Sequence, residues 1–160
     1  MLRFRRVQHI TSDSLNDSSL YNQETFYRAF LEDLGHAKSQ VIIESPFITS
    51  RRMAALFTTL RKLSKRGVQV VINTRNPEEH DGVYQFQAES AIANLQNLGI
   101  TVLYTAGHHR KLAIIDGRIT YEGSLNILSQ SDTCEIMRRI YSEQLANQML
   151  SFLNLQRFIG

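Results

Sequence analysis

The apolar residues of this chain recur with two different spacings, and the two spacings alternate along the sequence. From Asn22 the spacing is helical, because Phe26, Phe30 and Leu34 follow one another every four residues. Residues 40–44 then form a short β-branched run, which is typical of a buried strand. A helix followed by a buried strand is a unit from which α/β folds are built.

The same alternation is repeated after this strand. A second helical stretch, capped by Thr49 or Ser50, ends at Gly67, where a helix C-terminal glycine is expected. A third helix begins at about Tyr84 and is stopped by Gly99. Further strands are predicted between and after these helices, at residues 68–72, 100–104, 111–115, 118–121 and 134–140.

After residue 104 the helical spacing stops until the end of the chain. The pair 116–117 (Asp-Gly) joins two predicted strands and is a strong signal for a two-residue hairpin. A last helix begins at about Ser142. Because strands that alternate with helices indicate parallel pairing, we expect an α/β fold with a mixed, mainly parallel sheet flanked by helices.

The beginning of the chain has a different composition. Arginines at positions 3, 5 and 6 precede a polar run that is poor core material. We therefore predict an N-terminal arm over residues 1–20 and a single domain over residues 21–160. The arm has the positive charge of a signal peptide but no apolar stretch behind it, and no run is long enough to span a membrane. We expect a cytoplasmic protein that does not bind a membrane.

Composition narrows the function only slightly. Hydrophobic residues make up 42% of the 160 residues and charged residues 21%, as in an ordinary globular domain. The net charge of +3 weakly favours a polyanionic partner. Cys134 is the one cysteine, so an internal disulfide and a cysteine zinc site are excluded. Its apolar surroundings in the sequence predict a plain buried thiol.

The most informative segment is HRKLAIIDGRITYEGSLN, residues 109–126. It contains His109, Lys111 and Asp116 in the pattern H-x-K-x4-D, followed by G-S-x-N at residues 123–126. Side chains two residues apart on a strand point to the same side. The imidazole of His109 and the ammonium of Lys111 would therefore face the same group, and a phosphodiester, which the resemblance given below implies, would meet a nucleophile and a cation that holds one of its oxygens.

The remaining motif residues have supporting roles in this interpretation. Ser124 and Asn126 follow the hairpin and can return to the same phosphate as neutral hydrogen-bond donors. Asp116 lies at the turn, which we expect it to fix. An imidazole with a pKa of about 6.5 can attack phosphorus when neutral and protonate a leaving oxygen when charged, but His109 cannot do both in one step. His108 points away from Lys111 and is expected in a supporting or solvent-exposed position.

The motif resembles the signature of the phospholipase D superfamily, whose members break phosphodiester bonds through a covalent phosphohistidine. The active site of this family needs two copies of the motif, and the chain carries one. It is similar in this respect to the compact Nuc-type endonucleases, which work as homodimers. The resemblance therefore implies two copies of His109, Lys111 and Asn126 around one phosphate, without metal or cofactor. It also implies that a downstream glutamate, for which Glu135 is the candidate, orients the histidine.

Four further residues are candidates for substrate binding. Arg110 and Arg138 could contact phosphates, and Glu44 and Ser45 lie at the end of a predicted strand, where open α/β sheets bind ligands. For Glu44 a helix-capping or surface role is an equal alternative. The residues Glu-His-Asp at 79–81 are adjacent in a polar loop, so we expect a solvated turn and not a metal site.

The expected substrate is nucleic acid, with DNA favoured over RNA and with contacts to phosphates in place of base recognition. Basic character, one motif and a small domain all favour this class. The alternatives are a lipid or other phosphodiesterase of the same superfamily and a non-catalytic nucleic-acid-binding module. Single-stranded and double-stranded nucleic acids are both retained as candidate substrates. The chain is also a candidate part of a larger defence or helicase-linked system.

Overall fold

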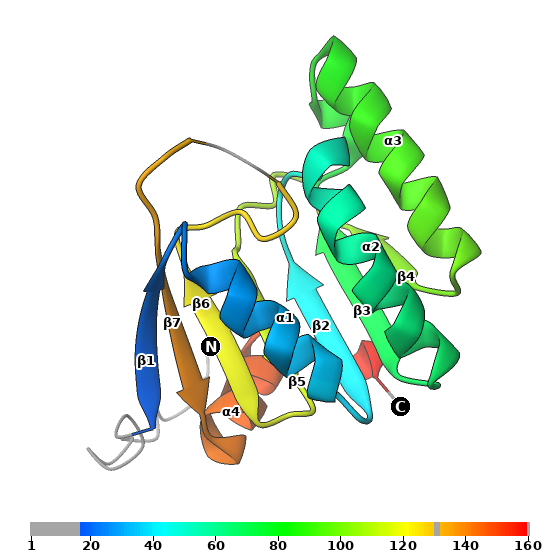
Figure 1. The fold of residues 1–160 in the computed structure, drawn as a ribbon. Coiled ribbons are helices and arrows are strands. Elements are labelled where there is room, and N and C mark those ends of the chain that lie inside the picture. Colours follow the sequence, from blue (N-terminus) through cyan, green and yellow to red (C-terminus); the bar gives the residue numbers. More distant parts are fainter. Residues whose placement is uncertain (1–16, 130–131, 160) are drawn as a thin grey trace, which may run out of the picture.

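The computed structural model describes residues 17–129 and 132–159. In these residues a seven-stranded sheet carries helices on both faces (Figure 1). The strands are β1 (Ser18–Asn22), β2 (Gln40–Glu44), β3 (Gln69–Thr74), β4 (Thr101–Tyr104), β5 (Leu112–Ile115), β6 (Ile119–Gly123) and β7 (Ile136–Tyr141). The helices are α1 (Phe26–His36), α2 (Ser50–Lys65), α3 (Gly82–Asn97) and α4 (Glu143–Phe152), with short 3-10 helices η2 (Pro77–Glu79) and η3 (Gln156–Phe158).

The strand order is β1-β7-β6-β5-β2-β3-β4. The mixed α/β sheet flanked by helices is confirmed, but parallel pairing does not dominate. Only β2–β3 and β3–β4 are parallel, whereas β1–β7, β7–β6, β6–β5 and β5–β2 are antiparallel. Parallel neighbours need a crossover connection, and α2 and α3 provide it between β2, β3 and β4. Helix α1 joins β1 to β2, but these two strands are not neighbours in the sheet. The later strands follow one another through loops and pair antiparallel.

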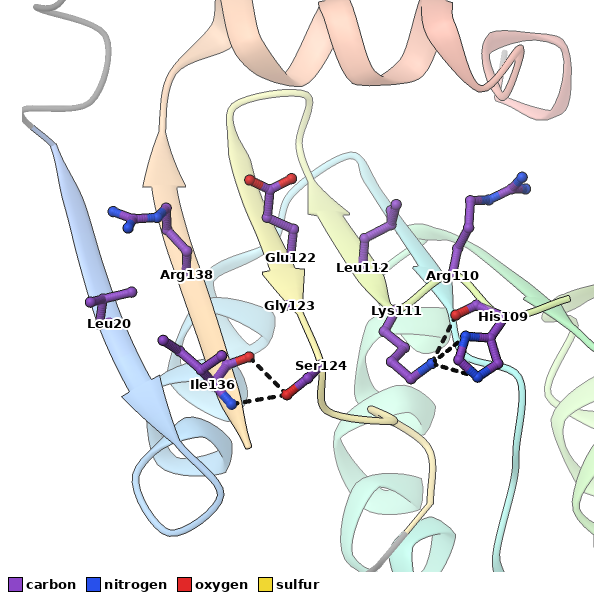
Figure 2. A pocket seen from close by; sticks show the side chains of 10 residues that line it. All are labelled: Leu20, His109, Arg110, Lys111, Leu112, Glu122, Gly123, Ser124, Ile136 and Arg138. Atoms are coloured by element: carbon purple, nitrogen blue, oxygen red, sulfur yellow. Dashed lines mark hydrogen bonds between the residues drawn. The ribbon is translucent and has the colours of Figure 1, made fainter. Parts of the chain in front are cut away.

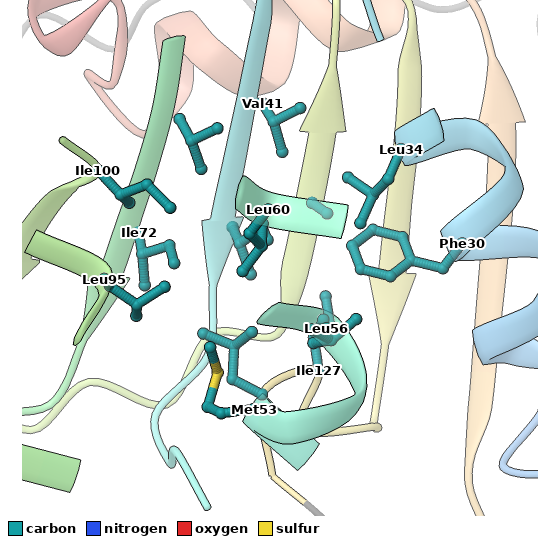
Figure 3. Packing of buried hydrophobic residues seen from close by; sticks show 14 of the residues in the cluster. Phe30, Leu34, Val41, Met53, Leu56, Leu60, Ile72, Leu95, Ile100 and Ile127 are labelled. Atoms are coloured by element: carbon teal, nitrogen blue, oxygen red, sulfur yellow. The ribbon is translucent and has the colours of Figure 1, made fainter. Parts of the chain in front are cut away.

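The helices divide between the two faces of the sheet. Helices α1, α2 and α3 cover one face, and α4 lies behind the other (Figure 1). The larger core fills the first interface, where Phe30, Leu56 and Ile72 are buried among side chains from the sheet and the three helices (Figure 3). On the second face Ile42 and Ile114 pack in one cluster with residues of α4 and the C-terminal segment. Burial on both sides explains why β2 and β5 are apolar at most positions.

The predicted turns are formed by the backbone conformations that their residues favour. Gly67 follows α2 with a φ of 77°. In the hairpin between β5 and β6, Asp116 and Gly117 have φ values of 52° and 62°. Two successive positive φ values are what a tight hairpin requires, and Asp-Gly supplies them at low cost.

Part of the predicted N-terminal arm belongs to the sheet. Strand β1 pairs with β7, from Ser18 opposite Ile140 to Asn22 opposite Ile136. Residues 1–16, with the three arginines, lie outside the described residues. In the described part of the chain, no helix combines the length and apolar character that crossing a membrane requires.

Candidate active site

His109 and Lys111 lie side by side at the start of β5. Both lie in the loop that leads to Leu112, the first residue of β5, so the strand begins one residue later than predicted. The Lys111 ammonium lies 3.2 Å from Nδ1 of His109 and donates a hydrogen bond of 2.8 Å to the His109 carbonyl oxygen (Figure 2). The His109 ring is exposed. A nucleophile and a cation are therefore presented together to solvent.

This pair borders an open pocket of about 730 Å³. The pocket extends across the ends of β5, β6, β7 and β1, as Figure 2 shows. Two apolar side chains on it, Leu20 and Ile136, are 56% and 54% exposed. The residues that line it are Leu20, His109, Arg110, Lys111, Leu112, Glu122, Gly123, Ser124, Ile136 and Arg138. Five predicted site residues, His109, Arg110, Lys111, Ser124 and Arg138, thus share one cavity.

Ser124 connects this pocket to Glu135. Its hydroxyl donates to the Glu135 carboxylate and accepts a 3.0 Å hydrogen bond from the backbone nitrogen of Ile136. Hydrogen bonds from Ser124 and Thr133, together with the charge of Lys111, hold the pKa of Glu135 below its usual value. The carboxylate therefore stays charged at neutral pH. Its hydrogen bonds lead to Ser124 and Thr133 and not to His109 of the same chain.

The pKa of Lys111 also depends on these surroundings. Partial burial lowers its pKa, and the charge of Arg75 lowers it further, whereas the charge of Glu135 raises it. The net pKa lies below the ordinary value for lysine. Lys111 and Glu135 are thus close enough to affect one another, and Glu135 supports the charged form of the lysine.

Asn126 lies in a loop that is fixed from three directions. The Tyr27 hydroxyl donates to the carbonyl oxygen of Ile127 over 2.9 Å. The backbone nitrogen of Leu128 donates to the Ser45 hydroxyl, and its carbonyl oxygen accepts from the backbone nitrogen of Thr49. The amide oxygen of Asn126 is buried and has no hydrogen-bond partner among the described residues. The loop is held firmly, and Asn126 itself is not among the residues that line the His109 pocket.

Ser45 does not reach the pocket. Its side chain is fully buried, donates to the Phe47 carbonyl oxygen and accepts from Leu128. The expectation that it contacts substrate is therefore not met, because its hydroxyl is used to join the end of β2 to the Asn126 loop.

Glu44 is also withdrawn from the pocket. It is fully buried and forms two hydrogen bonds with the Arg110 guanidinium, one of 2.9 Å and one shorter. Asn73 donates a third, of 3.0 Å. This burial excludes a surface position for Glu44, and the hydrogen bonds of its carboxylate lead to Arg110 and Asn73 and not to a helix end or the pocket. Arg110 does line the pocket, but the hydrogen bond and charge of Glu44 hold its guanidinium in place and raise its pKa.

His108 lies inside the protein although its neighbour His109 is exposed. It is 3% exposed, and within residues 17–129 and 132–159 neither ring nitrogen has a hydrogen-bond partner. Burial lowers its pKa, and the Arg110 and Lys111 charges lower it further against the opposing effect of Glu44. The alternative of a solvent-exposed His108 is therefore wrong, because its side chain is buried.

Asp116 lies at the opposite end of β5 from Lys111. Its carboxylate accepts hydrogen bonds from the backbone nitrogens of Lys38, Ser39 and Gln40 and from the Ser39 hydroxyl, at 2.8–3.1 Å. Burial raises its pKa, but these hydrogen bonds outweigh it and the net pKa is lowered. Asp116 thereby joins the hairpin to the beginning of β2, away from the pocket.

Comparison with known proteins identifies this arrangement. The family model described as cardiolipin synthase, PLD-like domain, matches residues 30–155. The chain belongs to the phospholipase D-like family. No protein of the curated set matches it.

Solved structures share the phospholipase D-like fold at low sequence identity. Nuc from Salmonella typhimurium is 21% identical, with a TM-score of 0.68 over 89% of this chain and 96% of Nuc. NucT from Helicobacter pylori is 18% identical, with a TM-score of 0.65 over 84% and 91% of the two chains. Phosphatidylserine synthase from Haemophilus influenzae is 16% identical, with a TM-score of 0.64, and the match covers 86% of this chain and 38% of the synthase.

A second pocket of the phospholipase D-like chain lies behind Glu135. It has a volume of about 300 Å³ and is lined in part by Tyr27, Arg52 and Glu135. The Arg52 guanidinium lies 3.3 Å from the centre of the Tyr27 ring, and burial raises the pKa of that phenol to about 12. The sequence gives no signal for Tyr27, because its contact with the motif loop joins residues far apart in the chain.

Two further predictions concern the surroundings of this phospholipase D-like site. Arg138 lines the main pocket and donates to the Ser18 hydroxyl over 3.0 Å. Cys134 is exposed and lines the second pocket, so the prediction of a buried thiol is wrong. The reason is that β7 begins only at Ile136, and Cys134 lies in the loop before it.

The loop at residues 79–81 is more tightly attached than a solvated turn. Glu79 accepts a 3.0 Å hydrogen bond from the backbone nitrogen of Gly107 and lies 3.9 Å from the Arg75 guanidinium. The His80 ring packs against Phe47. Among the described residues, no three histidine, cysteine or acidic side chains are grouped as a metal site would require.

Proposed function

We propose that the chain is a metal-independent phosphodiesterase, and specifically a sequence-tolerant endonuclease that acts on DNA through a phosphohistidine intermediate at a homodimer interface. The observation that carries this proposal is the exposed His109 ring with the Lys111 ammonium 3.2 Å away, at the edge of an open pocket. An imidazole and a fixed cation are the groups that attack on a phosphodiester requires. Family membership supports the same chemistry.

The reaction has two displacements at phosphorus. An imidazole nitrogen of His109 attacks, a P–N bond forms, and the bond from phosphorus to the leaving oxygen breaks while the partner's His109 donates a proton to that oxygen. Water then attacks the phosphohistidine, the P–N bond breaks, and the partner's His109 takes a proton from the water. Lys111 and Asn126 of both copies stabilise the charge on the non-bridging oxygens.

A second copy of the chain is required by this scheme, since one histidine cannot be both nucleophile and proton donor in a single step. The open pocket supports a homodimer. The Leu20 and Ile136 side chains on it are more than half exposed, and contact with an identical surface across a twofold axis would cover them.

Nucleic acid is the proposed substrate because the pocket presents Lys111 and Arg138 on a chain of net charge +3. A lipid phosphodiester is the second candidate. The matched family model is that of a cardiolipin synthase domain, and the phosphatidylserine synthase shares the fold. Both substrate classes present the same phosphodiester to His109, so only activity separates them.

The test is cleavage of single- and double-stranded DNA in excess EDTA by the native protein and by His109→Ala. His36→Ala, which removes an exposed histidine of α1, is the matched control. We expect the native protein and the control to cut and His109→Ala to lose about 10³-fold or more in rate. Denaturation in mild base should leave a covalently labelled His109 for mass spectrometry. Cutting by all three proteins would overturn the proposal. Hydrolysis of phosphatidylglycerol vesicles without DNA cleavage would transfer it to the lipid substrate.

A further inference from the structure

Three rings surround a small pocket at the end of β2 and β3. Phe47 follows β2, His80 follows η2, and Tyr84 lies in the first turn of α3. They line a pocket of about 200 Å³ together with Ile48, Thr49 and Ser129, and we call it the ring pocket. The centres of the Phe47 and His80 rings are 5.1 Å apart, and Tyr84 is 61% exposed. An aromatic side chain this exposed at a pocket rim is available for a ligand.

The segment of residues 124–129 connects the ring pocket to the candidate active site. Ser129 lines the ring pocket, and Ser124, at the other end of the segment, lines the His109 pocket. The Ser124 hydroxyl also donates to Glu135, which lines the pocket behind it together with Ser129.

Arg75 provides a second connection. Its guanidinium donates to the His108 carbonyl oxygen over 3.1 Å, directly before His109 in the chain. The same guanidinium lies 5.4 Å from the centre of the Phe47 ring. The segment that carries the nucleophile and the ring pocket thus meet at one side chain.

Charge distinguishes the pockets. The pocket at His109 is lined by Arg110, Lys111 and Arg138 against one acidic residue, Glu122, which suits a phosphate. The residues that line the ring pocket include no aspartate, glutamate, lysine or arginine. A flat uncharged group therefore fits the ring pocket better than a phosphate does. Burial and the neighbouring Arg75 lower the pKa of His80, which keeps its ring neutral at pH 7.

We propose that the ring pocket, formed by Phe47, His80 and Tyr84, binds one unstacked nucleobase of a single strand whose cleaved phosphate lies at His109. This subsite serves the nuclease function proposed above and assigns it a substrate class, single-stranded nucleic acid. Bases in a duplex are stacked on their neighbours and cannot enter such a pocket, whereas bases in a single strand stack readily on aromatic side chains.

The test compares two exposed aromatic residues of the same helix. Tyr84 lines the ring pocket, and Phe86, which is 72% exposed, does not. Binding of labelled single-stranded and duplex oligonucleotides is measured by fluorescence anisotropy in EDTA, with His109→Ala as the parent protein so that nothing is cleaved. We expect Tyr84→Ala to weaken single-strand binding about tenfold or more, as loss of one stacked base predicts. Tyr84→Trp should retain binding, and Phe86→Ala and all duplex affinities should not change.

A set of oligonucleotides with one base-free position identifies the bound base. The parent protein should lose affinity when one particular base is absent, and Tyr84→Ala should not distinguish that oligonucleotide from the intact one. Equal losses for Tyr84→Ala and Phe86→Ala, or no sensitive base, would overturn the subsite while DNA binding stands. Failure of the parent protein to bind any nucleic acid would overturn the nuclease function itself, and the subsite with it.

Discussion

The phenolic oxygen of Tyr27 in α1 lies 2.9 Å from the carbonyl oxygen of Ile127, next to Asn126. A helix near the beginning of the chain thereby fixes the loop that follows the motif. Just before that helix, the Gln23 side chain accepts a hydrogen bond from the backbone nitrogen of Glu135. The docking of α1 therefore determines where two candidate catalytic residues lie relative to His109.

Removal of this hydroxyl should impair catalysis without removing any group from the pocket. For Tyr27→Phe we expect kcat to fall about tenfold with little change in KM, because the Asn126 loop loses its hydrogen bond. The free energy of unfolding should fall by about 1 kcal/mol. Steady-state kinetics and urea unfolding check both effects. Tyr104→Phe, an exposed tyrosine of β4, is the control. A rise in KM alone would show that the loop is positioned by other contacts.

Neutralising Glu135 should change the titration of Lys111. Because the carboxylate raises the pKa of Lys111, its replacement in Glu135→Gln should lower that pKa further. The glutamine still accepts a hydrogen bond from Ser124, so the variant isolates the charge. We expect a lower kcat, and NMR of labelled lysine side chains should show that Lys111 titrates at a lower pH than in the native protein. Cys134→Ser, at the exposed neighbouring position, should leave both unchanged. An unaltered lysine titration in Glu135→Gln would contradict the expectation.

Asp116 should make the free energy of unfolding depend on pH in the acid range. Its folded pKa is lowered, so its contribution is present above the unfolded pKa of about 3.9 and is lost as the pH falls through the folded pKa. We expect Asp116→Asn to reduce the free energy of unfolding by about 2 kcal/mol at pH 7. The difference from the native protein should shrink towards pH 3. Urea unfolding at several pH values measures it, with Asp132→Asn, at an exposed position, as control. A difference that does not vary with pH would exclude this linkage.

The contributions of Glu44 and Arg110 to the free energy of unfolding should be coupled. Arg110→Met leaves a fully buried carboxylate without its cation, which should cost about 3–5 kcal/mol of stability. Addition of Glu44→Gln should restore much of this loss, because the charge is then removed. A double-mutant cycle by urea unfolding measures the coupling, and Arg51→Met provides an exposed control. Additive effects of Arg110→Met and Glu44→Gln would disprove the coupling.

Local signals account for what the sequence predicted correctly. Strand β2 has the predicted bounds because its β-branched run is short and sharply ended, and the hairpin at 116–117 forms because Asp-Gly tolerates positive φ. Local signals do not show which strands pair with one another, since pairing depends on residues distant in sequence. Nothing near β5 indicates that it inserts between β6 and β2 and makes that pairing antiparallel.

The same distinction applies to the site. The two-residue spacing was sufficient to predict that His109 and Lys111 lie together. The burial of Glu44 could not be predicted, because its cation, Arg110, comes from the segment before β5, which the sequence does not place beside β2. Tyr27 gave no signal either, since the loop that it holds is formed by residues a hundred positions later.

The division of the sheet into an antiparallel and a parallel half has a consequence for how such an enzyme can diversify. The motif residues lie before β5, in the β5–β6 hairpin and at or after the end of β6, whereas the rings of the ring pocket come from connections between the parallel strands. The connection from β3 to α3 also carries Arg75 and Glu79, whose hydrogen bonds hold His108 and Gly107 directly before His109. We therefore expect an exchange of this connection to alter both the accepted polymer and the rate of the chemical step.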